Sequence, residues 1–315
     1  MQLLNQLTPK IISIAPMMGW TNPSMQKITN IIAPNMIFYS QMYHIEAIIR
    51  RPELLQYEPK NLIIQLGGSC PEKFFHVGRI LKERHIKNIN INVGCPSNKV
   101  QKGNFGACLM REPELVSDCL NALSESHASH YLSVKCRIGI DKEDSESFLN
   151  QFIETIATKA NIQSFIIHAR KAWLSGLNPK QNREIPPLNY DRVYQIKQKY
   201  PHLKIGINGG INNIKDISNH LKICDEVMLG RLVLNDLYKV HEIDAHFFNY
   251  KPLSRGTLIE QIKVYDNSMS RFLQSLFKGI SGCKEWRKTL PNINHYEELM
   301  SLNAKMQLLA TQKVR

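Results

Sequence analysis

Eight short apolar runs constrain the fold of this 315-residue chain more than any other feature. Most of them end in Gly, Pro or a polar residue, which is typical of β-strands buried on both faces. Hydrophobic residues make up 43% of the chain, enough to form a core around such strands. The predicted strands cover residues 11–17, 36–42, 62–68, 88–96, 131–139, 164–170, 204–210 and 226–231.

Segments with helical spacing separate these strands. The helical faces consist of Phe75, Val77, Ile80 and Leu81 before the fourth strand, and of Phe148, Phe152, Ile153 and Ile156 before the sixth. Eight alternations of strand and helix predict an α/β fold, the (β/α)8 TIM barrel, which usually needs ~250 residues. A doubly wound sheet is the structural alternative, but it usually has fewer strands and a Gly-rich first turn, and no such turn follows Met17.

The pattern changes after about residue 244. Apolar residues then recur at helical intervals, first at Leu258, Ile262, Tyr265, Met269, Phe272 and Leu276, then at Leu299, Leu302, Met306 and Leu309. Residues 250–315 carry 11 Lys and Arg against 5 Asp and Glu, whereas the preceding 249 residues carry 29 against 22. The sequence therefore predicts a barrel over residues 1–244, followed by a small, basic, all-α domain over residues 245–315.

The formal net charge of +13 favours a polyanionic partner such as nucleic acid, an anionic membrane or a phosphorylated ligand. Compositional drift is the alternative, because Lys, Asn and Ile are all used heavily. No run approaches the ~20 apolar residues of a membrane-spanning helix, and the N-terminus lacks the pattern of a signal peptide. An odd number of cysteines, 7, then predicts a reducing, cytoplasmic location with free thiols.

Cys95 stands out among these cysteines. No C-x-x-C pair occurs and the spacings match no zinc module, so no metal site is expected. Buried, inert packing is the interpretation for Cys108, Cys119 and Cys224. Cys95, in contrast, ends the fourth strand between Gly94 and Pro96, which places its thiol at the barrel mouth. An ordinary thiol is mostly protonated at neutral pH and is therefore a workable proton donor.

Other strand ends indicate a site for a phosphorylated cofactor. Gly209 and Gly210 let the backbone approach an anion, and Arg231 adds a cation that can fork onto a phosphate. An Asn-Gly-Gly alone is more often a turn, and the Gly-Arg at the next strand is what points to phosphate. Lys135 lies in an apolar strand, where it needs a negative partner or must extend to the rim. His168 shares a strand face with Arg170, and cofactor contact is favoured over a purely structural role.

These motifs together resemble the tRNA-dihydrouridine synthases over about residues 11–290. The matching segments are APMMGWT at 15–21, QLGG at 65–68, NVGCPS at 92–97, GACLM at 106–110, KCRIG at 135–139, NGGI at 208–211 and GR at 230–231. Residues 168–188, HARKAWLSGLNPKQNREIPPL, resemble the A-type subfamily, which modifies positions 20 and 20a of the tRNA D-loop.

The resemblance implies a flavin-dependent oxidoreductase that uses bound FMN, recharged by NADPH, to reduce uridine in tRNA to 5,6-dihydrouridine. In that family, hydride from the reduced flavin goes to C6 and a cysteine protonates C5, a role that falls to Cys95. The implied FMN contacts are Pro16, Met17, Met18, Gln65, Lys135, His168, Asn208, Gly209, Gly210, Gly230 and Arg231. The implied tRNA contacts are Asn92, Lys180, Arg183, Lys284 and Arg287. No protein partner is implied, and the oligomeric state stays open.

Three positions depart from the family pattern. Gly19 and Asn22 stand where Asp is usual in the A-type enzymes or frequent in the family, and Gln41 stands where Glu is usual. The loop over residues 49–61 also looks short. These departures leave the D-loop position open, but they do not touch Cys95 or the phosphate loops.

Two other functions fit parts of the pattern. A dihydroorotate-type dehydrogenase acting on a free pyrimidine keeps the phosphate site but has no need of a basic helical tail. A non-catalytic tRNA-binding protein on a decayed barrel keeps the basic tail but would be colourless when purified. Salt-sensitive binding of folded tRNA separates the first from a tRNA enzyme, and flavin absorption separates the second.

Overall fold

The computed structural model describes residues 11–127 and 131–311. Its strands are β1 (Ile11–Ile14), β2 (Ile37–Tyr39), β3 (Tyr43–His44), β4 (Leu62–Gly67), β5 (Asn88–Asn92), β6 (Tyr131–Arg137), β7 (Ser164–His168), β8 (Lys204–Asn208) and β9 (Glu226–Leu229). They form one parallel sheet in the order β2-β1-β9-β8-β7-β6-β5-β4-β3, and β2 also pairs with β4. This last pairing closes the sheet, so the predicted eight-stranded barrel is confirmed. The two-residue β3 is an addition beyond the end of β2.

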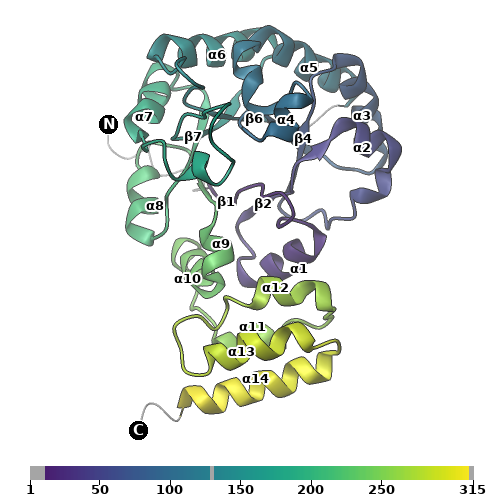
Figure 1. Ribbon diagram of the computed structural model, residues 1–315, viewed down its shortest axis with the longest axis vertical. Coiled ribbons are helices and arrows are strands. Elements are labelled where there is room, and N and C mark those ends of the chain that lie inside the picture. The colour runs from purple at the N-terminus through teal and green to yellow at the C-terminus, as the bar shows by residue number, and fades with distance from the viewer. Residues whose placement is uncertain (1–10, 128–130, 312–315) are drawn as a thin grey trace.

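Helices surround this barrel (Figure 1). They are α1 (Pro23–Ile32), α2 (Ile45–Arg50), α3 (Pro71–Glu83), α4 (Asn98–Lys102), α5 (Pro113–Ser126), α6 (Glu146–Lys159), α7 (Tyr190–Lys199), α8 (Ile214–His220), α9 (Leu232–Asn235) and α10 (Leu237–Phe247). Polar side chains cap the N-termini of several of these helices. At α1, for example, Asn22 Oδ1 accepts a hydrogen bond from the Met25 amide at 3.0 Å. The face of α3 differs from the prediction, because Phe74 is buried and Phe75 is 37% exposed. A face through Phe74, Val77 and Leu81 follows the helical period, and Phe75 lies off it.

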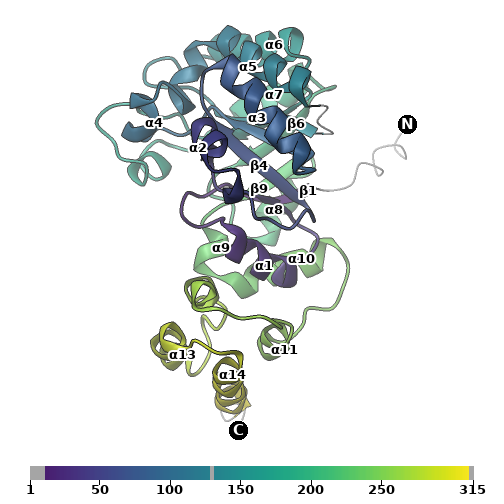
Figure 2. The ribbon, with the colours of Figure 1, turned by 90° about the vertical axis from the view of Figure 1, so that its right-hand side faces the viewer.

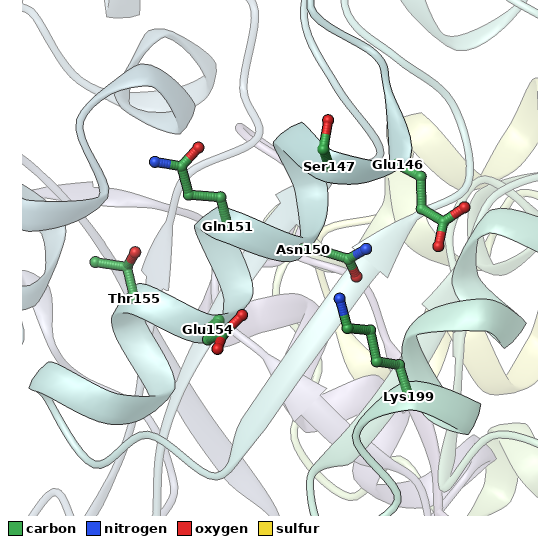
Figure 3. Close-up of a pocket in the computed structure, with 7 residues that line it drawn as sticks. All are labelled: Glu146, Ser147, Asn150, Gln151, Glu154, Thr155 and Lys199. Atoms are coloured by element: carbon green, nitrogen blue, oxygen red, sulfur yellow. The ribbon is translucent and has the colours of Figure 1, made fainter.

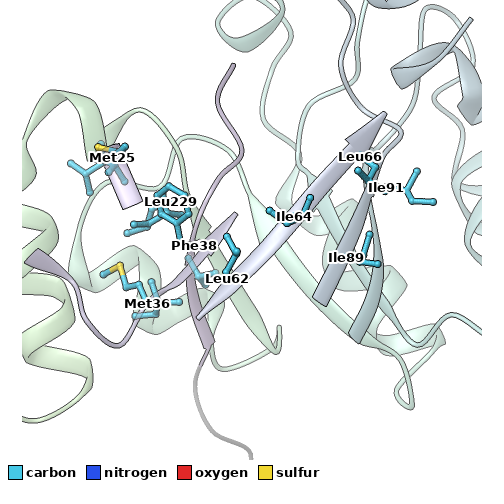
Figure 4. Close-up of a cluster of buried hydrophobic side chains, with 14 of the residues drawn as sticks. Met25, Met36, Phe38, Leu62, Ile64, Leu66, Ile89, Ile91 and Leu229 are labelled. Carbon is cyan, nitrogen blue, oxygen red and sulfur yellow. The ribbon is translucent and has the colours of Figure 1, made fainter. Parts of the chain in front are cut away.

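The strands alternate between two environments. Leu62, Ile64 and Leu66 of β4 belong to the large core between sheet and helices (Figure 4). Ile63, between them, belongs to a separate cluster inside the barrel with Ala15, Tyr39, Ile166 and Met228. Because successive strand residues face opposite sides, alternate positions of each strand face the surrounding helices and the barrel interior. The inward positions nearest the carboxyl ends of the strands are therefore the ones that can line a site.

A carboxyl group is buried inside the barrel at the amino end of β9. Glu226 is 4% exposed and its Oε1 accepts a hydrogen bond from Ser13 Oγ. Burial raises the pKa of Glu226 to about 7, with the nearby hydroxyl of Ser13 opposing the shift. Near neutral pH this carboxyl is thus partly protonated.

We expect Glu226→Gln to stabilise the protein at pH 8 and to change its stability little at pH 4. Glu226 ordinarily titrates near 4.5 but does so at about 7 in the fold. Below the unfolded pKa, the protonated Glu226 contributes fully to the free energy of unfolding. As the pH rises through the folded pKa, this contribution of roughly 1–3 kcal/mol is lost. Urea unfolding at both pH values measures the difference, with the exposed Glu83→Gln as a control. An equal effect at the two pH values contradicts a buried, titrating carboxyl.

The chain continues past the barrel into a helical region. This region comprises α11 (Arg255–Glu260), α12 (Ser270–Leu273), α13 (Cys283–Thr289) and α14 (Tyr296–Thr311). Figures 1 and 2 show it stacked beyond α1, α9 and α10. The expected boundary at residue 244 falls inside α10, which ends at Phe247. Asp244 is held there by Asn35 Nδ2 at 2.9 Å and by the Tyr250 hydroxyl at 2.7 Å.

The apolar spacing over residues 258–276 predicts one continuous helix in this region, and this prediction is wrong. Within residues 258–276, α11 ends at Glu260 and α12 covers only Ser270–Leu273, and a 3-10 turn at Asn267–Met269 lies between them. Asp266 accepts a hydrogen bond from the Ser268 amide at 2.8 Å, which starts a new helical turn and breaks the periodic run. The apolar residues are nevertheless buried, and the second predicted helix is confirmed as α14. Within the described residues, no helix has the length and apolar character needed to cross a membrane. The expected absence of a signal peptide concerns residues 1–10, which lie outside the described ranges.

Candidate active site

A ladder of polar side chains crosses the barrel interior beneath its mouth. Asn92 Nδ2 donates to Gln65 Oε1 at 2.9 Å, and Gln65 Nε2 donates to Asn90 Oδ1 at 2.8 Å. Asn90 Nδ2 then donates to Ser133 Oγ at 2.9 Å. All four residues are buried, and these bonds satisfy polar groups that burial otherwise penalises. The ladder fixes the orientation of each amide.

Asn92 carries this ladder into the Cys95 loop. Its Oδ1 accepts from the Gly94 amide at 3.1 Å and from the Cys95 amide at 3.0 Å. The Cys95 side chain is half-buried, and its Sγ lies 3.6 Å from Ser97 Oγ. Asn92 is 9% exposed and fully engaged within the protein. The structure thus gives it a positioning role for Cys95, and direct tRNA contact by Asn92 stays a prediction.

Lys135 lies across the mouth on β6. Its Nζ donates to Asn208 Oδ1 at 3.1 Å, which joins the ends of β6 and β8. Burial, and secondarily the positive charge of Arg137, lowers the pKa of Lys135 to about 8. The electrostatic neighbours of Lys135 include Cys95 and Glu226. No acidic side chain neutralises Lys135 directly in the described residues, so its charge is available to an anionic ligand.

His168 ends β7 in the same positive environment. Burial, followed by repulsion from Arg137 and Lys135, holds the pKa of His168 well below its usual range. The imidazole is therefore neutral near pH 7. Its Nδ1 and the Nε of Arg170 are buried, and neither has a hydrogen-bond partner in the part of the chain that the structure describes. Two buried polar atoms without partners at the mouth of a barrel are groups that a polar ligand can satisfy.

The ends of β8 and β9 form the predicted phosphate loops. Gly209 has φ +121° and Gly210 has φ +72°, conformations that favour glycine. A Cβ at Gly209 would also lie 3.3 Å from the His168 ring, whereas one at Gly230 would meet nothing within 4 Å. The turn is held by the Tyr190 hydroxyl, which donates to the Gly209 carbonyl at 2.7 Å. The backbone beside Gly230 is thus open to a ligand.

Arg231 follows Gly230 and leads into α9. Its Nη1 pairs with Glu184 Oε1 at 2.6 Å, and its Nη2 donates to the Arg183 carbonyl at 3.4 Å. Both partners of the ion pair are about half exposed, so the pair contributes ~0–1 kcal/mol. An anion in front of Gly230 can therefore compete for this guanidinium.

The loop after β1 supplies the remaining predicted cofactor contacts. Pro16 and Met17 are half-buried, whereas Met18 is 62% exposed. The Met17 amide donates to Thr21 Oγ1 at 2.9 Å, and the Met17 carbonyl accepts from the Thr21 amide at 3.0 Å. These bonds hold the loop as a tight turn at the barrel rim.

Arg137 is a residue of the site that the sequence did not single out. It is 5% exposed, and its Nε donates to the Gly94 carbonyl at 2.9 Å. Its Nη1 donates to the carbonyls of Lys171 at 3.0 Å and Asn182 at 3.1 Å. Arg137 thereby ties the Cys95 loop to the segment that carries Arg183. In the sequence, the only signal for this role is its place in the KCRIG motif, two residues after Lys135 on the same strand.

Gln101 of α4 makes a second tie between the same segments. Its Nε2 donates to the Pro96 carbonyl at 2.9 Å and to the Leu174 carbonyl at 2.6 Å. The buried Asn182 stabilises the second segment internally, because its Nδ2 donates to the Trp173 carbonyl at 2.9 Å. The position of the thiol is therefore coupled to the loop over residues 171–183.

The predicted tRNA contacts fall into two groups. Lys180 and Arg183 are exposed on the loop beside the mouth. Lys284 and Arg287 are exposed on α13, one helical turn apart on one face. The structure thus brings Arg183 into the electrostatic neighbourhood of Cys95, keeps Lys180 on the same loop, and places the second pair in the helical region.

The other cysteines differ from Cys95 in their surroundings. All seven thiols are free. Burial raises the pKa values of Cys119, Cys136 and Cys224 to about 12, so these thiols stay protonated and inert. Cys108 is half-buried, and burial raises its pKa as well.

Two surface cavities lie away from the mouth. One, of about 600 Å³, opens between α6 and α7 (Figure 3). The other, of about 540 Å³, lies at the amino ends of β6, β7 and β8. Neither is lined by a predicted site residue, and barrel chemistry collects at the opposite, carboxyl ends.

The mouth fits a phosphorylated, anionic cofactor. The unpaired buried atoms of His168 and Arg170 can bond to polar groups of such a cofactor, and the open backbone at Gly230 offers a place for phosphate oxygens. Lys135, Arg170 and Arg231 add positive charge, which favours an anion. This donor set matches a nucleotide-like cofactor rather than a metal ion.

Comparison with known proteins relates the whole chain to one family. Residues 13–313 match the model of a family described as Dihydrouridine synthase (Dus). The chain is 40% identical to the tRNA-dihydrouridine(20/20a) synthase of Vibrio cholerae, over 90% of this chain and 91% of the relative. It is 41% identical to the same-named protein of Shewanella oneidensis, over 91% and 89%, and 39% identical to that of Escherichia coli strain K12, over 90% and 86%.

Solved structures share the barrel at low sequence identity. The chain superposes on the crystal structure of TcOYE with pHBA with a TM-score of 0.50 and 8% identity, over 79% of this chain and 92% of that chain. At this identity the similarity concerns the fold alone.

Proposed function

This chain belongs to the dihydrouridine synthase family, and from that premise we propose that it reduces uridine at position 20, position 20a or both in the tRNA D-loop to 5,6-dihydrouridine. One observation carries the proposal within the structure. Asn92 and Arg137 hold the Cys95 loop at the mouth of the barrel. Beside it lie the cation Lys135 and the ring of His168, whose buried Nδ1 has no hydrogen-bond partner among the described residues.

FMN is the proposed bound cofactor and NADPH the proposed reductant. Gly209, Gly210, Gly230 and Arg231 would hold the phosphate, and Lys135 with His168 would face the ring. When bound, the flavin supplies the two electrons that reduce the C5–C6 double bond of the uracil ring. Below pH 8 Lys135 is mostly protonated, and its positive charge would stabilise negative charge on the ring.

Cys95 is the proposed proton donor to C5 of the uracil. Its neighbours Lys135, Arg137 and Arg183 are all cationic, so they stabilise the thiolate that remains after proton transfer. Half-burial of the thiol leaves it open to the base on one side and to solvent for reprotonation. Two backbone anchors, at the Cys95 amide and at the Gly94 carbonyl, fix its position.

Folded tRNA is the proposed partner, and its presence implies the predicted cytoplasmic location. A uridine must leave its stack to reach the barrel mouth, at a cost of a few kcal/mol. Phosphate contacts from Lys180 and Arg183, and from Lys284 and Arg287 on α13, offset that cost. We place the boundary between the catalytic and tRNA-binding parts after α10, at Phe247.

The direct test is conversion of a defined tRNA. Purified protein is incubated with NADPH and an unmodified tRNA that carries U20 and U20a, and dihydrouridine is mapped by position. We expect a yellow protein and dihydrouridine at one or both positions, with binding that weakens steeply as salt rises. Reduction of a free pyrimidine without tRNA, or a colourless protein that binds tRNA without turnover, would overturn the proposal.

FMN affinity is expected to fall as the pH rises above 8. Lys135 loses its proton near that pH in the flavin-free protein, and only the protonated form attracts an anionic cofactor. Fluorescence titration of FMN between pH 7 and 9.5 measures the trend. Lys135→Met should weaken binding and flatten the trend, whereas Arg231→Met should weaken binding at every pH and keep the trend. A trend that persists in Lys135→Met contradicts the assignment.

A further inference from the structure

The helical region touches the loop after β1 and the start of α10, which follows the proposed phosphate loop by one short helix. We define the brace as residues 267–278, which comprise the turn at Asn267–Met269, α12 and the residues that follow. It lies between α11 and α13 along the chain. Figures 1 and 2 both place the helical region against the side of the barrel that carries α1, α9 and α10.

Arg271 makes the first contact of the brace, with the loop after β1. Its Nη2 donates to the Gly19 carbonyl. The guanidinium carbon lies 5.0 Å from the centre of the Trp20 ring and 4.5 Å from that of Phe272. The two rings meet edge to face, with centres 6.0 Å apart. A planar cation held by two rings and a carbonyl is a directional contact that a point charge cannot reproduce.

The same loop is held from the opposite side by the barrel. The Gly19 amide donates to Gln41 Oε1 at 2.9 Å, and the Gln41 amide donates to the Thr21 carbonyl at 2.7 Å. Gly19 has φ +75°, so its peptide turns sharply between these two anchors. With Arg271 on the carbonyl and Gln41 on the amide, the turn after Met18 has one orientation.

The second contact of the brace reaches the segment after Arg231. Ser275 Oγ accepts from the Leu237 amide at 3.2 Å, at the start of α10. Lys278 Nζ lies 3.6 Å from Asp236 Oδ2, and Asp236 is the residue that caps α10. Only α9 separates these residues from Arg231. The brace therefore contacts both the loop after β1, at Gly19 and Trp20, and the chain that follows the phosphate loop.

We propose that Arg271 is a positioning residue for the flavin site, through which the helical region holds the loop after β1 in its binding conformation. The proposal rests on the proposed function, since FMN is the ligand that this loop would contact. The alternative is that Arg271, an exposed cation in a basic region, contacts tRNA phosphate. The engaged geometry of its guanidinium favours the positioning role.

The test compares Arg271→Met and Arg271→Lys with Lys284→Ala, a matched loss of an exposed cation on α13. Three readouts are needed: FMN affinity by fluorescence, tRNA affinity of the flavin-free protein, and hydrogen exchange of the Trp20 and Thr21 amides in flavin-free protein. These two amides donate to the Met17 carbonyl at 2.9 and 3.0 Å, so their exchange reports the turn itself.

We expect both Arg271 variants to weaken FMN binding about tenfold and to speed exchange of the two amides about tenfold. Lys284→Ala should leave both unchanged and weaken tRNA binding instead. Wild-type FMN affinity and exchange in Arg271→Lys would show that charge alone matters and overturn the proposal. Weaker tRNA binding in Arg271→Met, with FMN affinity and exchange unchanged, would also overturn it. Failure of wild-type protein to bind FMN contradicts the proposed function instead, and the exchange arm still tests the loop.

Discussion

Cys95→Ala is expected to lower turnover by about 10²–10⁴-fold while FMN and tRNA still bind. The thiol is the proposed source of the proton for C5, and its removal leaves the anchors of the loop intact. Those anchors use the backbone, at the Cys95 amide and the Gly94 carbonyl. Single-turnover reduction of tRNA by pre-reduced enzyme measures the loss without interference from the NADPH step.

Cys108→Ala provides the matched control for this variant. Cys108 is also half-buried near the mouth, but its thiol donates to the Phe105 carbonyl at 3.2 Å and has no proposed chemical role. We expect near wild-type turnover in Cys108→Ala. Dihydrouridine formed by Cys95→Ala at the wild-type rate would remove Cys95 from the mechanism.

Arg137→Met is expected to destabilise the protein by about 2–4 kcal/mol and to reduce turnover in the fraction that folds. The variant leaves the carbonyls of Gly94, Lys171 and Asn182 without their buried donor. Burial lowers the pKa of Arg137 to about 10, so it is still a cation at neutral pH and its bonds are charge-assisted. Urea unfolding gives the stability, and single-turnover rates at saturating tRNA give the chemical effect.

Arg111→Met is the matched control for Arg137→Met, because it removes an exposed arginine instead of a buried one. Arg111 also makes two polar contacts, to Asp141 Oδ2 at 3.1 Å and to Glu143, but its side chain is 42% exposed. Exposed ion pairs contribute ~0–1 kcal/mol, so this variant should unfold close to wild type. Equal losses in the two variants would contradict the role assigned to the Arg137 contacts.

The barrel was predictable because its signal is local. A strand buried on both faces is apolar along its length, as Leu62–Gly67 is, and eight such runs leave few topologies. The ends of those strands then predicted Cys95, Lys135 and His168 at one mouth, since parallel strands end on the same side. The structure brings these three residues into one electrostatic environment.

Contacts between distant segments were not predictable in this way. Arg137 bonds the Asn182 carbonyl 45 residues away, and Arg271 bonds the Gly19 carbonyl 252 residues away. Such acceptors are backbone groups whose positions depend on loop conformation, and a carbonyl leaves no trace in a residue pattern. The helix expected over residues 258–276 failed for a related reason. Apolar spacing records which residues are buried, while Asp266 decides where the helix restarts.

The amide ladder inside the barrel has a consequence for how such an enzyme can change over evolution. Asn92, Gln65, Asn90 and Ser133 anchor the proposed acid to the core of the barrel, whereas the proposed tRNA contacts Lys284 and Arg287 lie on α13. Substitutions on α13 can therefore alter how tRNA is held while the thiol keeps its place. The reaction centre and this part of the proposed tRNA contact lie on separate parts of the chain, so α13 can change without rebuilding the reaction centre.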